Sequence, residues 1–297
     1  DIISMKLLFI INPIAGKGKT KDAIPVIRNF CHQRGIQCTI METLGPRDAT
    51  RIVKEHCSAY SAVVAVGGDG TVLEVSNGLM DTDIPLGILP LGKGNDFARA
   101  MKIPVEFSQV ENALKIIAEN TAQNVDLVAF NGRVFLNIAS VGFDAEIIQD
   151  LNKIKRFIKG KGAYLISVFL KFLTYKPKDV ELLIDGEKKA AKVFLAAVCN
   201  GICYGGGMMI NPKGSVTDGL LDVIMISPVP RYKIPFLLMK FIKGNHLSLP
   251  YVTSYQCKEV QISSKEPLAV NVDGESPMKT PITLLIKPLS MRVFGNT

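Results

Sequence analysis

The sequence predicts an α/β protein of two domains: a three-layer α/β domain comes first and an antiparallel β-sandwich second. Short apolar runs alternate with helix-compatible segments up to Asn120, which is typical of a parallel sheet with helices on its faces. From Asn124 onward many short strands are separated by Asp-Gly and Asn-Gly turns, a pattern that favours an antiparallel sandwich. The 297 residues are enough for two domains of about 150 residues each.

The first domain, at residues 5–124, is expected to alternate strand and helix throughout. Its apolar residues recur with the helical period, as Ile24, Ile27 and Cys31 do on one face of the first helix. The expected elements are strands at 6–11, 37–43, 62–66 and 85–90, and helices at 21–34, 47–59 and 105–120.

A glycine-rich turn, Gly67-Gly68-Asp69-Gly70-Thr71, follows the third of these strands. Glycine admits a positive φ and has no Cβ to keep a ligand away, and the backbone N–H groups of such a turn, with a helix N-terminus behind them, bind phosphate. Asp69 places a negative charge beside that phosphate. This indicates that Asp69 works with a metal ion or organises water and neighbouring donors. The alternative is a tight strand-to-helix turn without a ligand.

A second glycine-rich turn follows about 25 residues later, and it reads Leu91-Gly92-Lys93-Gly94-Asn95-Asp96-Phe97-Ala98. Asn95 or Asp96 is placed to cap the helix that comes next. Two such turns suit neighbouring strand ends of one sheet, which is where open α/β sheets bind ligands.

The first strand leads into Asn12-Pro13-Ile14-Ala15-Gly16, and the following Gly18-Lys19-Thr20 resembles the end of a P-loop. A P-loop requires glycine where this chain has Pro13, so the P-loop interpretation fails. On the residues alone, the glycines and lysines here are turn residues and a solvated surface.

The second domain is expected to contain strands throughout, with Asn131-Gly132 as a hairpin turn. Two final strands are expected at 281–294, and the pattern does not show to which domain they belong. The other predicted strands lie at 125–130, 133–140, 179–184, 191–199, 220–227, 259–263 and 268–272.

Taken together, the two glycine-rich turns resemble the signature loops of the diacylglycerol kinase catalytic family, and within it the soluble bacterial lipid kinases. The first turn alone is less specific, because sphingosine kinases and NAD kinases share it. The Asn12-Pro13 segment is similar to the family's first nucleotide-contacting loop. The resemblance covers nearly the whole chain. It implies a Rossmann-like nucleotide-binding domain, a lipid- and metal-binding domain at residues 125–281, and C-terminal strands at about 282–297 that return to the first domain.

The resemblance implies that ATP contacts four loops of the first domain. Many bacterial relatives have threonine where this chain has Lys93, so the contact made by Lys93 is open. The implied nucleotide-binding residues are Asn12, Pro13, Ile14, Ala15, Gly16, Thr43, Gly67, Gly68, Asp69, Gly70, Thr71, Val72, Leu73, Lys93 and Asn95.

Phosphoryl transfer to a hydroxyl needs a general base, and the candidates are the aspartates of three Asp-Gly turns, Asp185, Asp218 and Asp273. Composition cannot choose among them, since Asp-Gly is also a common hairpin turn. The segment that ends in Asp273-Gly274-Glu275 resembles the family's catalytic turn. This implies that Asp273 is the base and that Glu275 assists, whereas Asp185 is a structural turn.

The segment from Ser215 to Asp222 resembles the family's metal loop. The resemblance implies that Mg²⁺ binds the Asp218 carboxylate with the backbone carbonyls of Ser215 and Leu220, an all-oxygen set of the kind that Mg²⁺ prefers. Asp69, Asp96 and Asp126 match aspartates that link the metal loop to the nucleotide site through water. Tyr204-Gly205-Gly206-Gly207 is similar to a further landmark of the family, although a flexible loop is the simpler account.

Composition limits the partners and the compartment. The net charge of +8 and pI near 9.1 indicate an acidic partner, which could be a nucleotide, nucleic acid or an anionic membrane. Two basic, apolar segments at 151–178 and 231–246 fit peripheral membrane contact, with solvated lysines on a packed helix as the alternative. There is no run of about 18 apolar residues, and no leader is expected, because the first strand leads directly into Asn12-Pro13. The six cysteines lack Cys-x-x-Cys spacing, so they are expected to be reduced thiols in the cytoplasm.

The expected function is an ATP- and Mg²⁺-dependent lipid kinase that converts diacylglycerol to phosphatidic acid at the inner face of a membrane. The alternatives are a sphingoid base, phosphatidylglycerol or NAD as acceptor, or a non-catalytic nucleotide-binding regulator. NAD is disfavoured, because NAD kinases carry an Asn-Glu pair and this chain has none. Nucleic acid is not expected, because the basic residues alternate with aliphatic rather than stacking aromatic residues. The oligomeric state, including a homodimer, stays open.

Overall fold

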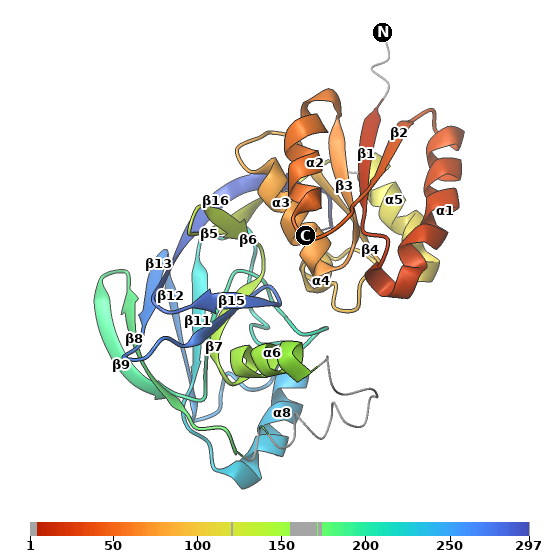
Figure 1. Cartoon of the computed structure of the whole chain (residues 1–297). Helices are drawn as coiled ribbons and strands as arrows, with labels where there is room; N and C mark the ends of the chain where they lie inside the picture. The colour runs from red at the N-terminus through yellow and green to blue at the C-terminus, as the bar shows by residue number, and fades with distance from the viewer. Residues whose placement is uncertain (1–4, 120, 155–170, 172–173, 297) are drawn as a thin grey trace.

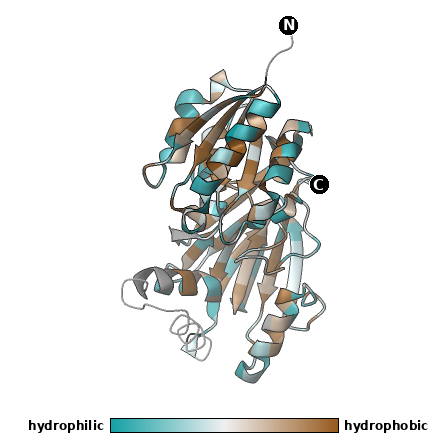
Figure 2. Ribbon diagram, turned by 90° about the vertical axis from the view of Figure 1, so that its right-hand side faces the viewer, coloured by the Kyte–Doolittle hydropathy of each residue, from teal (hydrophilic) through white to brown (hydrophobic). Residues whose placement is uncertain are grey.

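The computed structural model describes residues 5–119, 121–154, 171 and 174–296. They form an α/β domain with a parallel sheet and a second domain built on antiparallel strands (Figure 1), which confirms the predicted fold class. Figure 2 shows the most hydrophobic residues concentrated in the strands of both domains. Within the described residues, no helix is both long enough and apolar enough to cross a bilayer.

The first domain has four parallel strands in the order β2-β1-β3-β4. Helix α1 packs beside α5 and α2 packs beside α3, so helices cover both faces of the sheet. Because both faces are covered, every residue of β3 is buried, and this explains its uninterrupted apolar run. The elements are β1 (Lys6–Ile11), η1 (Ala15–Gly18), α1 (Lys19–Gln33), β2 (Gln37–Glu42), α2 (Asp48–His56), η2 (Cys57–Ala59), β3 (Ala62–Gly67), α3 (Asp69–Leu79), β4 (Leu86–Pro90), α4 (Asp96–Ala100), η3 (Phe107–Gln109) and α5 (Val110–Glu119).

The second domain places two sheets around a core. One is a six-stranded antiparallel sheet in the order β12-β11-β10-β7-β14-β15. The other strands of this domain belong to a sheet that it shares with the first domain. The elements from residue 123 onward are β5 (Gln123–Phe130), β6 (Arg133–Phe135), β7 (Ile138–Gly142), α6 (Phe143–Ile154), β8 (Lys178–Ile184), β9 (Glu187–Val193), β10 (Leu195–Cys199), β11 (Leu221–Ile226), η4 (Arg231–Lys233), α8 (Ile234–Ile242), β12 (Val252–Cys257), β13 (Glu259–Ser263), β14 (Ala269–Val272), β15 (Glu275–Lys279) and β16 (Ile282–Val293).

Strand β16 joins the parallel strands to the antiparallel ones within a single ten-stranded sheet. It pairs antiparallel with β5 and β13, and Val293 near its end pairs in parallel with Leu86 of β4. The pairing with β5 shifts register between Lys287 and Met291, where Leu289 has a positive φ of 49°. The two strands expected at 281–294 are therefore a wrong prediction: the segment is one bulged strand near the middle of the sheet.

Two predicted strands are wrong, because the chain leaves one sheet partway along each of them. The segment at 133–140 divides into β6 and β7, since the backbone N–H groups of Leu136 and Asn137 donate to a side chain instead of a neighbouring strand. The segment at 191–199 divides at Phe194, where the chain passes from the ten-stranded sheet to the six-stranded sheet. The helix expected at 105–120 begins only at Val110.

The predicted hairpin at Asn131-Gly132 is confirmed. Both residues have positive φ, 46° and 70°, and Phe130 pairs with Arg133 across the turn. Asp185-Gly186 and Asp273-Gly274 adopt the same backbone conformation, so the three turns are alike in local geometry.

Candidate active site

Four loops of the first domain meet at the carboxyl ends of neighbouring parallel strands, the edge where open α/β sheets bind ligands. Asn12 follows β1, Thr43 follows β2, Gly67 ends β3, and Leu91 follows β4. The N–H of Thr43 donates to Ile11 at 2.8 Å and that of Asn12 to Val66 at 3.1 Å, so these ends are joined by hydrogen bonds beyond the strands themselves.

The loop after β1 packs against the loop after β4. The Asn12 carbonyl accepts hydrogen bonds from the Thr20 hydroxyl at 2.8 Å and from the N–H of Ala15 at 3.2 Å, which closes the turn that contains Pro13. Gly16 has φ of 57°, and a Cβ there would lie 2.2 Å from the Leu91 carbonyl oxygen. Only glycine fits this approach. Ile14 extends from the same loop with 83% of its surface exposed.

The two glycine-rich turns also touch through their backbones. A Cβ on Gly92 would lie 2.2 Å from the Cα of Gly68, and a Cβ on Gly94 would lie 2.5 Å from a carboxylate oxygen of Asp69. The requirement for glycine at Gly92 and Gly94 is thus a packing requirement between loops.

Asp69 connects the two turns. Its carboxylate oxygens accept hydrogen bonds from the N–H groups of Asn95 and Asp96, both at 2.7 Å. Burial and the neighbouring Asp96 raise the pKa of Asp69, whereas these N–H donors favour its ionised form. The negative side chain in this glycine-rich turn is therefore explained in part by the N–H hydrogen bonds that it accepts from the neighbouring turn.

The expected cap of the helix after the second turn is wrong in detail. Asn95 occupies the N-cap position of α4 in a left-handed conformation (φ 57°), and it makes no side-chain cap bond. Its side chain instead accepts from the N–H of Gly92 at 2.9 Å and donates to Pro90 and Gly92. The first N–H of α4 is bound by Asp69, a residue 27 positions away in the chain.

The remaining residues of the first glycine-rich turn divide between surface and core. Gly70 is exposed at the start of α3, and Val72 lines the cavity described below. Thr71 and Leu73 are buried, with the Thr71 side chain against Gly67.

Asp96 joins the two domains. Its carboxylate accepts the N–H of Gly206 at 3.0 Å and that of Gly207 at 2.7 Å. Both glycines have positive φ, so the Tyr204–Gly207 segment turns its backbone donors toward α4. The family landmark seen in the sequence is therefore a bonded interdomain contact.

Asp273 lies in the turn between β14 and β15, with φ of 47°. Its carboxylate accepts N–H groups from Leu136 at 3.0 Å, Asn137 at 3.2 Å and Ile138 at 2.8 Å, in the break between β6 and β7. Burial raises the pKa of Asp273 to about 7, with a contribution from Asp69, although the N–H donors oppose the rise.

A cavity of about 660 Å³ joins these groups. The first domain contributes Asp69, Lys93 and Asp96 to its wall, and the second contributes Asp273. The rest of the wall is mostly apolar and comes from α6, α8 and the six-stranded sheet: Phe143, Ile147, Ile148, Phe194, Leu195, Ile226, Ile234, Leu237 and Phe241. The cavity thus has a polar end at the glycine-rich loops and an apolar chamber in the second domain. Asp273, whose pKa is raised to about 7, lies on its wall.

A buried polar cluster in this chamber was not found from the sequence. The Asp144 carboxylate accepts hydrogen bonds from the Ser140 hydroxyl and from the N–H of Ala145, the latter at 2.8 Å. Asn271 donates to the Ser140 hydroxyl at 3.3 Å, and its carbonyl accepts the N–H of Gly274 at 3.0 Å. Through the bond from Gly274 to Asn271, the cluster holds the turn that contains Asp273. The available signal was the placement of Asn271 on β14, two residues before Asp273 in the turn that follows.

The expected metal residues lie outside this cavity. Asp218 is exposed in a turn where it accepts the N–H of Leu220 at 3.0 Å, and the Ser215 hydroxyl accepts the N–H of Thr217 at 3.3 Å. Burial of part of the group, with Asp222 and Asp126 nearby, raises the pKa of Asp218. The described residues contain no cluster of three or more His, Cys, Asp or Glu side chains of the kind that alone binds a metal.

Asp126 is fully buried and connects this turn to β16. Its carboxylate accepts the N–H groups of Gly219 and Leu289, each at 2.7 Å. The three expected network aspartates, Asp69, Asp96 and Asp126, therefore each accept direct backbone hydrogen bonds from a different chain segment.

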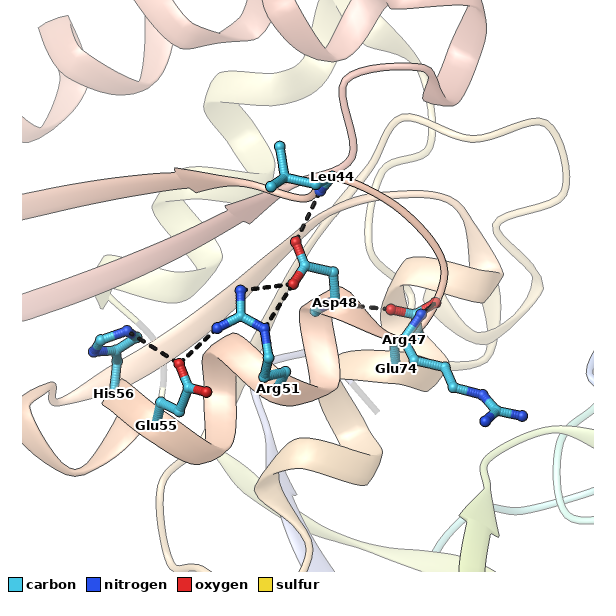
Figure 3. A network of polar contacts seen from close by, with 8 residues as sticks. Leu44, Arg47, Asp48, Arg51, Glu55, His56 and Glu74 are labelled. Carbon is cyan, nitrogen blue, oxygen red and sulfur yellow. Dashed lines mark hydrogen bonds and ion pairs between the residues drawn. The ribbon is translucent and has the colours of Figure 1, made fainter.

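The loop after β2 is held in place by a polar network (Figure 3). Asp48 accepts the N–H of Leu44 at 2.8 Å, and Glu74 of α3 accepts the N–H groups of Arg47 and Ala49. This arrangement leaves the Leu44 side chain 92% exposed, beside Thr43. Leu44 and Ile14 are thus two exposed apolar residues in the loops where a nucleotide was expected.

Several expected residues lie outside what the structure describes. The side chain of Glu275 and most of the basic segment at 151–178 belong to this group. Asp185 accepts the N–H groups of Lys258 and Glu259 on a surface hairpin outside the cavity wall, as a structural turn does. The six cysteines are free thiols.

Two protein-family models match this chain, and together they cover most of its length. The model of the diacylglycerol kinase catalytic domain matches residues 6–130, and that of the YegS C-terminal NAD kinase beta sandwich-like domain matches residues 137–295.

Two relatives illustrate the level of similarity. The chain is 30% identical to a protein named "Diacylglycerol kinase" of Mycobacterium tuberculosis (strain H37Rv), over 97% of this chain and 94% of that one. It is also 30% identical to "Probable lipid kinase YegS-like" of Pseudomonas aeruginosa (strain PAO1), over 94% of this chain and 90% of that one.

The fold is shared with solved structures. A crystal structure of a diacylglycerol kinase from Bacillus anthracis str. Sterne aligns with a TM-score of 0.74 at 24% identity, covering 100% of this chain and 98% of that chain. Another crystal structure from the same organism reaches a TM-score of 0.79 at 25% identity, with 100% and 99% covered.

Proposed function

The chain belongs to the diacylglycerol kinase catalytic family, and from this premise we propose that it transfers the γ-phosphate of ATP to the hydroxyl of diacylglycerol, giving phosphatidic acid. The observation that carries the proposal is the single cavity in which Asp69 and Lys93 of the glycine-rich loops, Asp273 and an apolar chamber come together. The glycine-rich loops suit a polyphosphate, and the chamber suits the acyl part of a lipid.

The phosphates of ATP would bind the loops at Asn12–Gly16, Gly67–Leu73 and Lys93–Asn95, with backbone N–H groups and the Lys93 ammonium as donors. Thr43, Leu44 and Ile14 lie in the adjoining loops, and the exposed apolar side chains of the last two suit the face of the base. Since Asp69 and Asp96 bind loop N–H groups, their role is to hold the loops in this arrangement.

Asp273 would act as the general base. It takes the proton of the lipid hydroxyl as the oxygen bonds to the γ-phosphorus, the bond from that phosphorus to the β–γ bridging oxygen breaks, and ADP leaves. A pKa of about 7 suits this step, because the carboxylate is both available and basic near neutral pH. Glu275, the next residue but one, is proposed to assist.

Mg²⁺ is proposed to bind the turn of Ser215, Asp218 and Leu220. The donor set fits, because one carboxylate with backbone carbonyls is an oxygen set of the kind that Mg²⁺ takes, and Asp126 and Asp222 add negative charge nearby. Bound there, Mg²⁺ would supply positive charge that balances these carboxylates. Asp126 connects this turn to β16, because its carboxylate accepts the N–H groups of both Gly219 and Leu289.

We further propose that the enzyme works in the cytoplasm at the inner face of the membrane, where its substrate lies. Its net charge of +8 favours an anionic surface. A homodimer is compatible with this arrangement, and the proposal does not need one.

The test measures ADP formation from ATP with Mg²⁺ and one of four acceptors: diacylglycerol in mixed micelles, sphingosine, phosphatidylglycerol or NAD. Asp273→Asn is compared with Asp185→Asn, which alters the same type of Asp-Gly turn outside the cavity. We expect turnover with diacylglycerol that is lost in Asp273→Asn, with ATP binding retained, and unchanged in Asp185→Asn.

Each other outcome changes the proposal. Turnover with a different acceptor replaces diacylglycerol as substrate but keeps the kinase. Turnover that survives in Asp273→Asn and is lost in Asp185→Asn reverses the assignment of the base. ATP binding without turnover on any acceptor overturns the kinase and supports a nucleotide-binding regulator.

A further inference from the structure

Helix α8 has apolar residues on two opposite sides. Ile234, Leu237 and Phe241 are 3–7% exposed, and they line the cavity that contains Asp273. At about 100° per residue, Phe236 and Met239 lie on the other side, where they are 59% and 54% exposed. A helix that is apolar all round normally has both sides covered.

The exposed apolar surface begins in η4, before the helix, and continues to the last residue of α8. Tyr232, one turn before Phe236, is 80% exposed, and Ile242 is 52% exposed. We call Tyr232, Phe236, Met239 and Ile242 the outer face of α8. The described residues contain a few other exposed large hydrophobic residues, and the others are isolated or lie at the loops of the first domain: Ile14, Leu44, Phe107, Leu183 and Leu289.

Positive charge surrounds the outer face. Arg231, Lys233, Lys240 and Lys243 flank it, and the sequence from 227 to 257 contains no Asp or Glu. The Lys240 ammonium lies 5.4 Å from the Phe236 ring centroid, and Lys233 lies 5.8 Å from that of Tyr232 while it donates to Tyr251 at 2.7 Å. Cations held beside exposed rings are the arrangement found at the boundary between lipid headgroups and acyl chains.

An anionic bilayer explains this surface better than a second copy of the chain. A symmetric contact would bring this basic patch against itself, in a chain whose net charge is already +8. Anionic headgroups complement the charge, and acyl chains complement the apolar residues. The helix lies at the end of the second domain away from the first domain and its glycine-rich loops (Figure 1).

We propose that α8 docks on an anionic membrane leaflet through its outer face, and that its inner side forms one wall of the route by which a lipid enters the cavity. The proposal rests on the proposed function, because it takes a lipid as the acceptor. It adds which surface meets the bilayer and why a substrate embedded in a membrane reaches Asp273.

The test uses the full chain and a double variant, Phe236→Gln with Met239→Gln. Neither residue is on the described cavity wall. The matched control, Phe107→Gln with Leu183→Gln, removes two exposed apolar residues elsewhere. Sedimentation measures binding to vesicles of phosphatidylcholine alone and to vesicles of phosphatidylcholine with phosphatidylserine. We expect wild type and control to bind the mixed vesicles, and the double variant to bind them about tenfold or more weakly.

Activity separates docking from catalysis. With diacylglycerol embedded in the mixed vesicles, the double variant should lose turnover in proportion to its binding, whereas with a short-chain, monomeric diacylglycerol it should match wild type. Lys240→Gln with Lys243→Gln should weaken binding to the mixed vesicles and leave binding to pure phosphatidylcholine unchanged.

Equal vesicle binding by the double variant and wild type would overturn the docking proposal while leaving the kinase intact. So would loss of turnover on the monomeric substrate, or a dimer of the wild type that the double variant disrupts. Vesicle binding through α8 without phosphorylation of any lipid would overturn the proposed function and leave docking standing.

Discussion

Two effects act in opposite directions on the pKa of the Asp273 carboxyl group. Burial disfavours the ionised form and three backbone N–H donors favour it, with a resulting pKa of about 7. We expect kcat/KM to rise through about pH 7 and to level off above it, because a general base must be ionised. A rate on the monomeric substrate that is flat from pH 5 to pH 9 would contradict the assignment.

The same pKa makes a stability prediction whose sign is opposite to that of an ordinary carboxylate. The folded state retains the proton of Asp273 to a higher pH than the unfolded state, so this group lowers stability as pH rises from about 4 to 7. The Tm of Asp273→Asn relative to wild type should therefore increase over that range. A difference that stays constant would place the titration elsewhere.

Asn271 is expected to be a positioning residue for Asp273. Asn271→Ala removes the acceptor of the Gly274 N–H and leaves Ser140 and Asp144 with fewer partners, which costs about 1–3 kcal/mol of stability. We expect kcat to fall at least tenfold with the KM for ATP unchanged. Asn77→Ala, another buried asparagine but outside the cavity wall, should lower Tm similarly and leave kcat unchanged. Equal losses of kcat would reduce Asn271 to a general structural role.

At the scale of single residues, the sequence pattern left three Asp-Gly turns as candidates for the general base. Only the family resemblance selected one of them, Asp273. The structure shows why local pattern could not do so. Asp185 and Asp273 have nearly the same φ, 45° and 47°, and both accept backbone N–H groups. They differ in partners that lie far away in the chain, since the donors to Asp273 belong to residues 136–138.

The contact between the two glycine-rich turns is the most restrictive packing at the scale of elements. In Gly92→Ala the new methyl group would overlap the Gly68 backbone at 2.2 Å, and backbone cannot move aside as a flexible side chain can. We expect a Tm lower by several degrees and weaker ATP binding. Gly70→Ala is the matched control for Tm, because a Cβ there meets nothing within 4 Å and alanine favours a helix more than glycine does. A Tm for Gly92→Ala equal to that of wild type would show that the turns are not in contact.

Helices and strands were predictable where the same pattern of buried and exposed residues continued along the whole element. The alternation of strand and helix in the first domain followed from apolar periodicity, and β3 from its apolar run. The failures occurred where a partner changed partway, as at Leu136 and Phe194, because periodicity records burial and does not record which sheet the neighbour belongs to. Helix α6 begins at Phe143, whereas a helix was considered only for the basic segment from residue 151 onward.

For the whole molecule, the bond from Asp96 to the glycine segment of the second domain predicts interdomain coupling. Asp96→Ala removes the acceptor for the N–H groups of Gly206 and Gly207. We expect faster hydrogen exchange at these two amides and a lower kcat, because the cavity is built from both domains. Asp22→Ala, which alters an exposed carboxylate on α1, should change neither. Unchanged exchange at Gly206 and Gly207 would show that other contacts hold the segment.

The two-domain class was predictable from chain length and turn spacing, but the way the domains join did not follow from the pattern and was implied only by the family resemblance. Strand β16 lies between β4 and β13, and its neighbours come from residues 86 and 259–262, a separation that no sequence window reveals. The cavity has the same origin, since Asp69 and Asp273 reach one wall from opposite ends of the chain.

The position of β16 also has a consequence for synthesis on the ribosome. Among the described strands it is the last in chain order, yet it lies inside the ten-stranded sheet and supplies the antiparallel partner of β5 along most of its length. A nascent chain that has emerged only as far as β15 therefore exposes the edges of β5 and β13 to other chains. The sheet closes only after residues 282–293 leave the exit tunnel, so protection of these edges before that point would fall to chaperones.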